Sequence, residues 1–280
     1  MLVEKAIELY MEYLRSNTRP NTVRAFYYTL SRFKAVFSGQ DLNNVKDIQI
    51  IEFIHDISPD CSSTTKNTRV SALRAFYNFI NEVADDGLVN PCMRPIVRKM
   101  FKVSRGSSPK LLDKDLIDEI IFRTINERDR LILELMGRAG MRVGEVLNVR
   151  PSDIDSDAST IAIAEPKSGR VGEKVFITKK LCGKLQSYIT KRPSIKNKII
   201  FDISYSTAHR MVKRSGLLVN SKLRPHDLRR HAATQASRNS IPLEIVSKVI
   251  LRHADISTTQ RYLGTVDPSE ASRWIEHLNR

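Results

Sequence analysis

The segments GRAGMRVGEVL at residues 137–147, RPHDLRRH at residues 224–231 and LRHADISTTQRY at residues 251–262 carry the most information in this 280-residue chain. Their charged and reactive side chains are, in chain order, Arg142, His226, Arg229, His253 and Tyr262. A phosphoryl group under nucleophilic attack gathers negative charge on its non-bridging oxygens, and paired guanidiniums can hold those oxygens bidentately. Histidines can donate to the same oxygens or move protons near neutral pH, and a tyrosine hydroxyl can be the covalent nucleophile. The pattern therefore predicts attack on a phosphodiester by a protein hydroxyl, without a metal ion.

Arg142 is expected at the start of a helix, directly after Gly140 and Met141. A helix N-terminus adds free N–H groups and the positive end of its dipole to an anion site. Glu145 follows one helical turn later and could fix the guanidinium by an ion pair. The alternative is an ordinary surface pair at i and i+3, which contributes little.

His226 and Arg229 are three residues apart, a spacing that puts both on one face of a helix. Pro225 before them is a favourable first residue of a helix. Arg229 would be the second guanidinium that holds the non-bridging oxygens, with Arg142 as the first. His226 would donate to a phosphate oxygen or accept the tyrosine proton. Taken alone, His-x-x-Arg is more often an exposed surface pattern. Arg230 and His231 point elsewhere on the helix and are expected to be structural or DNA-contacting.

The expected nucleophile is Tyr262, and Ser257 or Thr258 would cap the short helix that carries it. A free phenol has a pKa of about 10, so nearby guanidiniums would have to favour the phenolate or a histidine accept its proton. The alternative is a surface aromatic on an amphipathic helix. Tyr188 and Tyr205 lack the histidine partner upstream, which favours Tyr262 over both.

The order Arg … Lys … His-x-x-Arg … His … Tyr resembles the tyrosine recombinase, or phage-integrase-like, family over nearly the whole chain. The length is most similar to the Xer branch, which includes the archaeal XerA proteins. The resemblance supports the Arg142–Glu145 pair, and it implies a lysine on a hairpin turn, here Lys167, as the general acid that protonates the leaving 5′-oxygen. Arg170 and Lys174 share this turn, so Lys174 is a rival acid and a simple phosphate contact is the alternative for all three.

The chain departs from the family at Leu251-Arg252-His253, where the family usually has Leu-Gly-His. Glycine commonly serves a tight turn with positive φ, so an arginine there predicts a relaxed turn or an added phosphate contact. The resemblance implies that His253 hydrogen-bonds the scissile phosphate. It also implies that the C-terminal segment around Trp274 docks into a neighbouring protomer of a cyclic tetramer; packing within the same chain is the alternative.

The formal net charge of +15 is uneven along the chain. Residues 1–100 carry 13 Lys and Arg against 11 Asp and Glu, whereas residues 101–280 carry 33 against 20. Such an excess on the half that holds the phosphoryl pattern favours a nucleic-acid partner over a merely solubilising surface.

Other classes of protein are disfavoured by composition. The three cysteines, Cys61, Cys92 and Cys182, are widely scattered, so neither a disulfide framework nor a zinc site is expected. No apolar run approaches the length of about 18–20 residues that spans a bilayer. The N-terminal MLVEKAIELYMEYL is amphipathic and contains acids, unlike a signal peptide, so a cytoplasmic protein without cofactor or metal is expected.

Residues 1–95 are expected to form a four-helix unit, with helices near 1–15, 21–37, 47–56 and 63–84. The resemblance implies that this unit is the family's SAM-like core-binding domain. Helical periodicity and the breaks at Asp86-Gly87 and Asn90-Pro91 support these limits. Polar side chains on these helices are candidate DNA contacts, although ordinary solvated faces remain the alternative. They are Thr22, Arg24, Lys66, Asn67, Arg69 and Arg74.

Residues 96–110 are expected to be a basic linker, since RPIVRKMFKVSRGSSPK at 94–110 holds six basic residues and no acid. Residues 111–280 are expected to be the catalytic domain and the C-terminal oligomerisation segment. STIAIAE and KVFIT predict two short strands around the turn PKSGRVGE. The expected fold class is therefore mainly α with a small β insertion (α+β), and DNA contacts are expected from Arg170, Lys174, Arg230 and Arg252.

The resulting functional hypothesis is a site-specific DNA recombinase that works through a covalent 3′-phosphotyrosine and a Holliday junction. The covalent bond conserves phosphoryl energy, so ATP is not expected. Resolution of chromosome dimers is favoured because no extra N-terminal domain is evident; a mobile-element integrase and DNA inversion are alternatives. A type IB topoisomerase, a non-catalytic DNA-binding protein and a metal-dependent nuclease are rivals, of which the last needs a carboxylate cluster that the sequence does not place.

Overall fold

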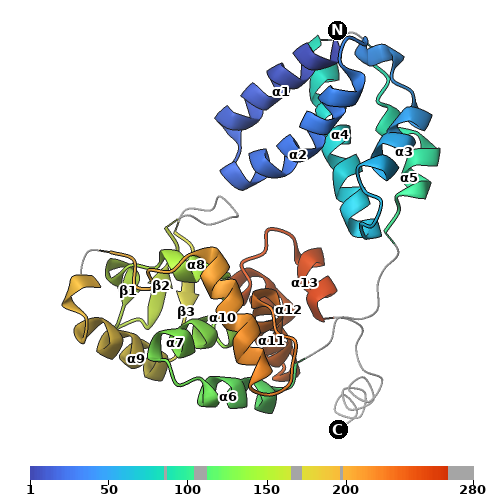
Figure 1. Cartoon of the computed structure of the whole chain (residues 1–280). Coiled ribbons are helices and arrows are strands. Elements are labelled where there is room, and N and C mark those ends of the chain that lie inside the picture. The colour runs from blue at the N-terminus through green and yellow to red at the C-terminus, as the bar shows by residue number, and fades with distance from the viewer. Residues whose placement is uncertain (85–86, 104–111, 165–171, 196–197, 264–280) are drawn as a thin grey trace, which may run out of the picture. The chain divides into compact units, whose positions relative to one another are not determined.

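The computed structural model describes residues 1–84, 87–103, 112–164, 172–195 and 198–263. Contacts divide the chain into two compact units, Met1–Ser107 and Ser108–Arg280. Helices dominate both units, and the second also has a small sheet (Figure 1). The predicted fold class, mainly helical with a small β insertion, is confirmed.

The first unit is a helical bundle around one apolar core. Its helices are α1 (Val3–Asn17), α2 (Pro20–Phe37), α3 (Asp47–Asp56), α4 (Ser63–Ala84) and α5 (Pro95–Met100), with 3-10 turns at Leu42–Asn44 and Pro91–Met93. Pro20 and Pro95 each stand at the first turn of a helix, where the missing N–H costs nothing. Phe33, Phe76 and Tyr77 are among its largest fully buried side chains, so aromatic packing holds the unit together.

The predicted linker is wrong in its first part. Residues 95–100 form helix α5, which contacts α3, and Val97 and Phe101 are buried in the core of the first unit. Val97 and Phe101 lie four residues apart and so share one face of a helix. The basic residues around them favoured a linker over this helical pattern. The hinge expected in the remainder, at 104–111, lies outside the described residues.

The second unit is built around α11, which lies between α7 and α13. Its elements are α6 (Lys114–Arg123), α7 (Glu127–Gly137), α8 (Val143–Asn148), β1 (Ile154–Asp155), β2 (Thr160–Ala162), β3 (Lys174–Phe176), α9 (Lys179–Thr190), α10 (Tyr205–Leu217), α11 (Pro225–Arg238), α12 (Leu243–Ile245), a π-helix (Val246–Ile250) and α13 (Ile256–Leu263), with 3-10 turns at Pro151–Asp153 and Pro193–Ile195. Figure 1 shows α11 and α13 close together in the second unit.

The predicted hairpin is present as β2 and β3, which pair antiparallel with Ile161 opposite Val175. The two-residue strand β1, which was not predicted, adds a third, antiparallel strand with Ile154 opposite Ile161. Ile161 and Val175 are buried, so the sheet is held on the core by its apolar face.

Gly140 allows the chain before α8 to approach the π-helix closely. Its φ of +65° is in the left-handed region, and a β-carbon there would lie 3.1 Å from Cγ2 of Ile250 and 3.3 Å from its carbonyl oxygen. Only glycine fits both conditions without strain. This contact brings the start of α8 beside the segment that precedes α13.

Candidate active site

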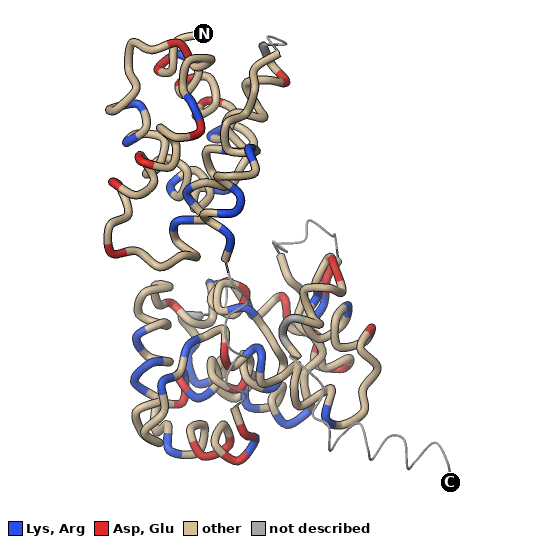
Figure 2. Tube along the Cα trace, turned by 90° about the vertical axis from the view of Figure 1, so that its right-hand side faces the viewer, with Lys and Arg blue, Asp and Glu red and all other residues tan. Residues whose placement is uncertain are grey.

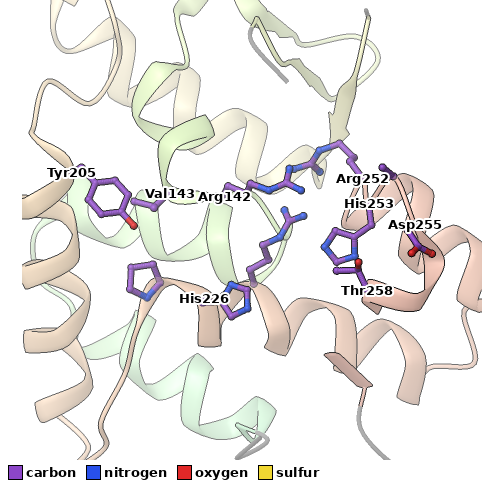
Figure 3. Close-up of a pocket in the computed structure, with 11 residues that line it drawn as sticks. Arg142, Val143, Tyr205, His226, Arg252, His253, Asp255 and Thr258 are labelled. Carbon is purple, nitrogen blue, oxygen red and sulfur yellow. The ribbon is translucent and has the colours of Figure 1, made fainter. Parts of the chain in front are cut away.

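A pocket of about 580 Å³ opens on the second unit where α8, α10, α11 and the segment before α13 meet. Its lining includes Arg142, Tyr205, His226, Arg252 and His253, which come from parts of the chain far apart in sequence and converge on one space (Figure 3). Arg229, Asp255 and Thr258 also line it. Of the six residues predicted to be catalytic, the structure brings four together here, Arg142, His226, Arg229 and His253.

Arg142 is the N-cap of α8, as the sequence predicts, and it is paired with Glu145. The carboxylate accepts from the Arg142 backbone N–H at 2.8 Å and from Nη1 at 2.6 Å. Glu145 also lies 2.5 Å from Nη2 of Arg252 and 4.0 Å from Nη1 of Arg229. The predicted surface alternative is wrong, because the side chain of Glu145 is only 6% exposed.

Arg229 is buried in the middle of the site. Its two terminal nitrogens donate to the carbonyl oxygens of Gly140 and Leu251, on either side of the pocket wall. The guanidinium therefore ties the start of α8 to the segment before α13, and Arg229 forms part of the pocket wall.

His226 and His253 are both favoured in their neutral forms. The pKa of His226 is lowered by partial desolvation and then by the charges of Arg230 and Arg229. Burial, followed by the charges of Arg229 and Arg142, lowers the pKa of His253 to about 4. At neutral pH each ring therefore keeps one nitrogen that can accept a proton and one that can donate.

Thr259 of α13 orients His253. Its hydroxyl lies 2.8 Å from Nδ1 of the buried ring, and Thr259 itself is fully buried. A neutral ring that accepts at Nδ1 carries its proton on Nε2, where it can donate to a phosphate oxygen. Thr259 was not predicted as a site residue, although it follows His253 by six residues, a spacing at which a helix start can fold back onto the histidine.

Tyr262 lies in α13, one helical turn beyond Thr259, and its side chain is outside the described residues. The start of α13 is capped by Asp255, which accepts from the backbone N–H of Ser257 at 2.9 Å and from its hydroxyl at 2.6 Å. The cap predicted from the sequence was instead Ser257 or Thr258. Asp255 takes this part because its carboxylate can accept two hydrogen bonds at once.

The other predicted site residues have varied surroundings. Lys167, Arg170 and Trp274 lie outside the described residues, whereas Lys174 is exposed at the start of β3. Arg230 is 3.8 Å from Asp227. His231 is buried, and its Nδ1 lies 3.1 Å from the Leu112 carbonyl oxygen, so its role is structural.

The predicted DNA contacts on the first unit also differ among themselves. Arg24 is exposed on α2, and Lys66 lies 3.5 Å from Nδ1 of His55. Arg69 donates to the Ile57 carbonyl oxygen and to the Ser58 hydroxyl while stacking on Tyr28 at 4.8 Å. Arg74 is half-buried on α4. Of these four residues, Arg24 is exposed and the other three are partly buried.

The relaxed turn predicted at Arg252 is wrong, because Arg252 itself adopts a φ of +50°. The arginine therefore occupies the kind of backbone position that glycine fills elsewhere. Tyr205, the first residue of α10, was not predicted to belong to the site, but it lines the pocket opposite His253 (Figure 3). No signal in the local sequence of Tyr205 places it there.

The second unit, which carries this pocket, holds most of the chain's charge excess. Figure 2 shows Lys and Arg spread over many helices of that unit rather than confined to one. A pocket lined by arginines and neutral histidines within a basic surface defines a site for a phosphodiester of nucleic acid.

Comparison with known proteins agrees with this class. Residues 110–267 match the Phage integrase family and residues 7–82 match the Phage integrase N-terminal SAM-like domain, so the chain belongs to the phage integrase family. It is a tyrosine recombinase of the Xer-like kind, an enzyme that cleaves and rejoins DNA in site-specific recombination.

The relatives span almost the whole chain. A tyrosine recombinase of Pseudothermotoga lettingae is 28% identical over 95% of this chain and 95% of its own. Tyrosine recombinase XerA of Thermococcus kodakarensis is 27% identical over 93% of this chain and 88% of its own. Among solved structures, the Tn1549 transposon integrase in complex with transposon right end DNA has a TM-score of 0.78 at 15% identity, with both chains fully covered. This likeness shows that the fold is shared.

Among the described residues, none of the helices is both long and apolar enough to cross a lipid bilayer. No group of three or more His, Cys, Asp or Glu side chains suited to a metal ion occurs in the described part of the chain.

Proposed function

We propose that Tyr262 is the nucleophile and that Arg142, Arg229, His226 and His253 stabilise the phosphoryl group that it attacks. The observation that supports this proposal most is the convergence of these four side chains on one pocket, with Tyr262 on the helix that follows the last of them. A buried, pre-arranged set of donors stabilises developing charge far better than mobile side chains in water do.

The proposed step balances without a cofactor. The phenol oxygen of Tyr262 forms a bond to phosphorus, the bond from phosphorus to the 5′-oxygen breaks, and a 3′-phosphotyrosine results. Neutral His226 accepts the phenol proton, since its lowered pKa leaves the ring unprotonated at neutral pH. Lys167 gives a proton to the departing 5′-oxygen, with Lys174 as the rival donor. A 5′-hydroxyl from a partner strand reverses the sequence and completes strand exchange.

Trapping on a suicide substrate tests this chemistry. The full-length protein is incubated with nicked duplexes from its own genome in the presence of EDTA, and the covalent adduct is mapped by mass spectrometry. We expect an adduct on Tyr262 that Tyr262→Phe abolishes and Tyr205→Phe retains, which makes Tyr205, a residue of the pocket lining, a matched control. An adduct on another residue would refute the assignment, and the absence of any adduct with DNA binding intact would refute catalysis.

We also propose that this enzyme resolves chromosome dimers in the cytoplasm, acting as a tetramer on two copies of a recombination site. Its likeness to Xer proteins over most of the chain supports that part. In the tetramer, the C-terminal segment around Trp274 would dock on a neighbouring protomer. A plasmid with two direct copies of the trapped site should lose the intervening DNA, and Trp274→Ala should abolish this deletion while the protein still forms the covalent adduct. Insertion into unrelated sites would favour an integrase instead.

A further inference from the structure

Arg252 combines two properties that are rarely found together. Its side chain is only 2% exposed, and its φ of +50° is in the left-handed region. A residue with a β-carbon is strained in this conformation, whereas glycine is not. A buried guanidinium also costs free energy of desolvation unless it is paired. The contacts of this side chain must offset both costs.

Those contacts join three segments of the second unit. Nη2 of Arg252 lies 2.5 Å from Oε2 of Glu145 in α8, and Nη1 donates to the carbonyl oxygen of Ile250 at 2.8 Å. Its Nε lies 3.9 Å from Oε2 of Glu173, the residue before β3. The arginine therefore ties the loop that carries His253 to α8 and to the hairpin at once.

Glu145 is the centre of this arrangement. Arg142 holds one carboxylate oxygen, Oε1, at 2.6 Å, while Arg252 holds the other, Oε2, at 2.5 Å. Because both oxygens are held, the carboxylate cannot turn, and the Arg142 guanidinium has a fixed partner. Figure 3 shows the guanidiniums of Arg142 and Arg252 side by side at the edge of the pocket.

We propose that Arg252 is a positioning residue of the recombinase reaction, which locks Glu145 so that Arg142 is aimed at the scissile phosphate. This inference rests on the proposed function. The proposed action of Arg252 on the phosphate is indirect, because its Nη2 donates to the same carboxylate that holds Arg142. The part expected for it from the sequence, a direct DNA contact, is thereby replaced by an action through Glu145.

The charge of Arg252 also matters for the pocket. Burial raises the pKa of Glu145, but Arg252 and then Arg142 lower it by more in total. The pKa is therefore below its ordinary value, and the carboxylate remains ionised. Arg142, Arg229 and Arg252 together face two carboxylates, Glu145 and Glu173. The surplus of one positive charge in this group is of the sign that a phosphodiester neutralises.

The test compares wild-type protein with Arg252→Gly, Arg252→Lys and Ser240→Gly. Single-turnover cleavage is measured on the duplex recovered by suicide trapping, at saturating DNA and across pH. Ser240 also has a positive φ, of 61°, and is exposed, so Ser240→Gly controls for the backbone change alone. The thermal midpoint of each variant is measured alongside.

We expect Arg252→Gly to keep or raise the thermal midpoint, because glycine relieves the strained φ. Its cleavage rate should fall about tenfold to hundredfold, as expected when a catalytic group is misplaced by about an ångström. Arg252→Lys should not restore the rate, because a single ammonium cannot hold Glu145 and the Ile250 carbonyl with the same geometry. Ser240→Gly should cleave like the wild type.

The pH profile gives a readout that a purely structural role would not change. Glu145 is faced by Arg142, Arg229 and Arg252, so loss of Arg252 raises its pKa. An ionised Glu145 is needed, so cleavage by Arg252→Gly should be lost at a higher pH than in the wild type as the pH falls. The pKa of His253 is lowered by Arg229, Arg142, His226 and Arg252, so loss of Arg252 raises this pKa too. Because the neutral ring is the active form, this change also shifts the loss of cleavage to higher pH.

Each other outcome is decisive. If the wild type forms no adduct, the proposed function fails. If the wild type cleaves and Arg252→Gly matches it at every pH, the positioning role fails. Weaker DNA binding with an unchanged rate at saturation would mean a direct phosphate contact, full rescue by Arg252→Lys would mean that charge alone matters, and failure of Arg252→Gly to fold would mean a structural role. Each of these three results overturns the inference.

Discussion

The interior of the first unit and the wall of the active-site pocket are built on opposite principles. In the described part of the first unit, the buried polar side chains are Thr29 and Ser58, and neither carries a charge. The pocket wall of the second unit buries Arg229, Arg252 and His253. Apolar packing stabilises by removing surface from water, whereas buried charge costs free energy that only close pairing offsets. The second unit therefore loses some folding free energy by burying guanidiniums, and in return it holds positive charge at fixed positions in the pocket.

Backbone irregularity follows the same division. The π-helix Val246–Ile250, the positive φ of Arg252 and the close approach at Gly140 all lie around the pocket. π-Helical turns and strained residues gather at functional sites because regular elements cannot aim several side chains at one point. The first unit, in contrast, packs regular helices around aromatic rings such as Phe33 and Phe53, whose centroids are 5.2 Å apart.

The largest effect is expected at Arg229. Arg229→Ala removes a buried guanidinium that donates to Gly140 and Leu251 and faces Glu145, so the rate of covalent adduct formation should fall about a thousandfold. Arg229→Lys keeps the charge but cannot donate to both carbonyls, and it should remain folded while still cleaving at least about a hundredfold more slowly. Single-turnover cleavage with a far-UV circular dichroism spectrum of each variant checks this. Near-wild-type cleavage by Arg229→Lys would mean that charge, not geometry, is what this position supplies.

A substitution in the first unit should show the reverse pattern. Phe33 is fully buried and packs against Phe53, Phe76 and Tyr77. Phe33→Ala should lower the free energy of unfolding by about 3–5 kcal/mol, as other buried Phe truncations do. Urea denaturation measures this loss, and Tyr27→Ala, at an exposed site on the same helix, is the control. The cleavage rate per folded molecule at saturating DNA should be unchanged; a loss there would break the division between the two regions.

Thr259 sharpens the comparison within the pocket itself. Thr259→Val keeps the shape but removes the hydroxyl that meets Nδ1 of His253, so cleavage should fall about tenfold because the ring loses its orientation. Thr259→Ser restores a hydroxyl at the same place and should recover most of the rate. If Val and Ser cleave equally, the hydroxyl does not orient His253.

The pH dependence of stability follows from the lowered pKa of His253. In the unfolded chain the ring takes up a proton as the pH falls through about 6.5, whereas in the folded protein it does so only at about 4. The unfolded state binds more protons between these values, so stability falls as the pH drops across this window. His253→Gln should reduce the slope of the thermal midpoint between about pH 6.5 and 4. His209→Gln, at an exposed site on α10, is the control, and equal slopes in both variants would contradict the expectation.

Sequence alone predicted the parts that depend on spacing. The pair of Arg142 and Glu145 follows from helical geometry, and the β2–β3 hairpin follows from two β-rich runs around a glycine-containing turn. Contacts between distant segments were not predictable, because no local pattern records that Arg252 reaches Glu145, 107 residues away. Tyr205 enters the pocket for the same reason, through the packing of α10 against α8. Helix α5 was not predicted, because the basic composition of residues 94–110 is typical of a linker and its apolar face is short.

The smallest effect is expected from an exposed charge of the first unit. Arg24 is solvated on α2, so it costs the fold nothing and, if it contacts a DNA phosphate, contributes mainly electrostatic affinity. Arg24→Ala should weaken binding about equally on specific and unrelated duplexes and reduce the slope of log affinity against log salt by about 1.

Binding isotherms at several salt concentrations measure the slope, with Arg15→Ala on α1 as the matched exposed control. Sequence-selective loss of affinity would instead indicate that Arg24 reads a base edge, which gives bidentate discrimination rather than counterion release. An unchanged slope would remove Arg24 from the DNA interface. Either result sharpens the contrast between the two regions. A solvated charge such as Arg24 interacts weakly with a phosphate, whereas the charges of Arg229 and Arg252 act strongly because they are held out of water.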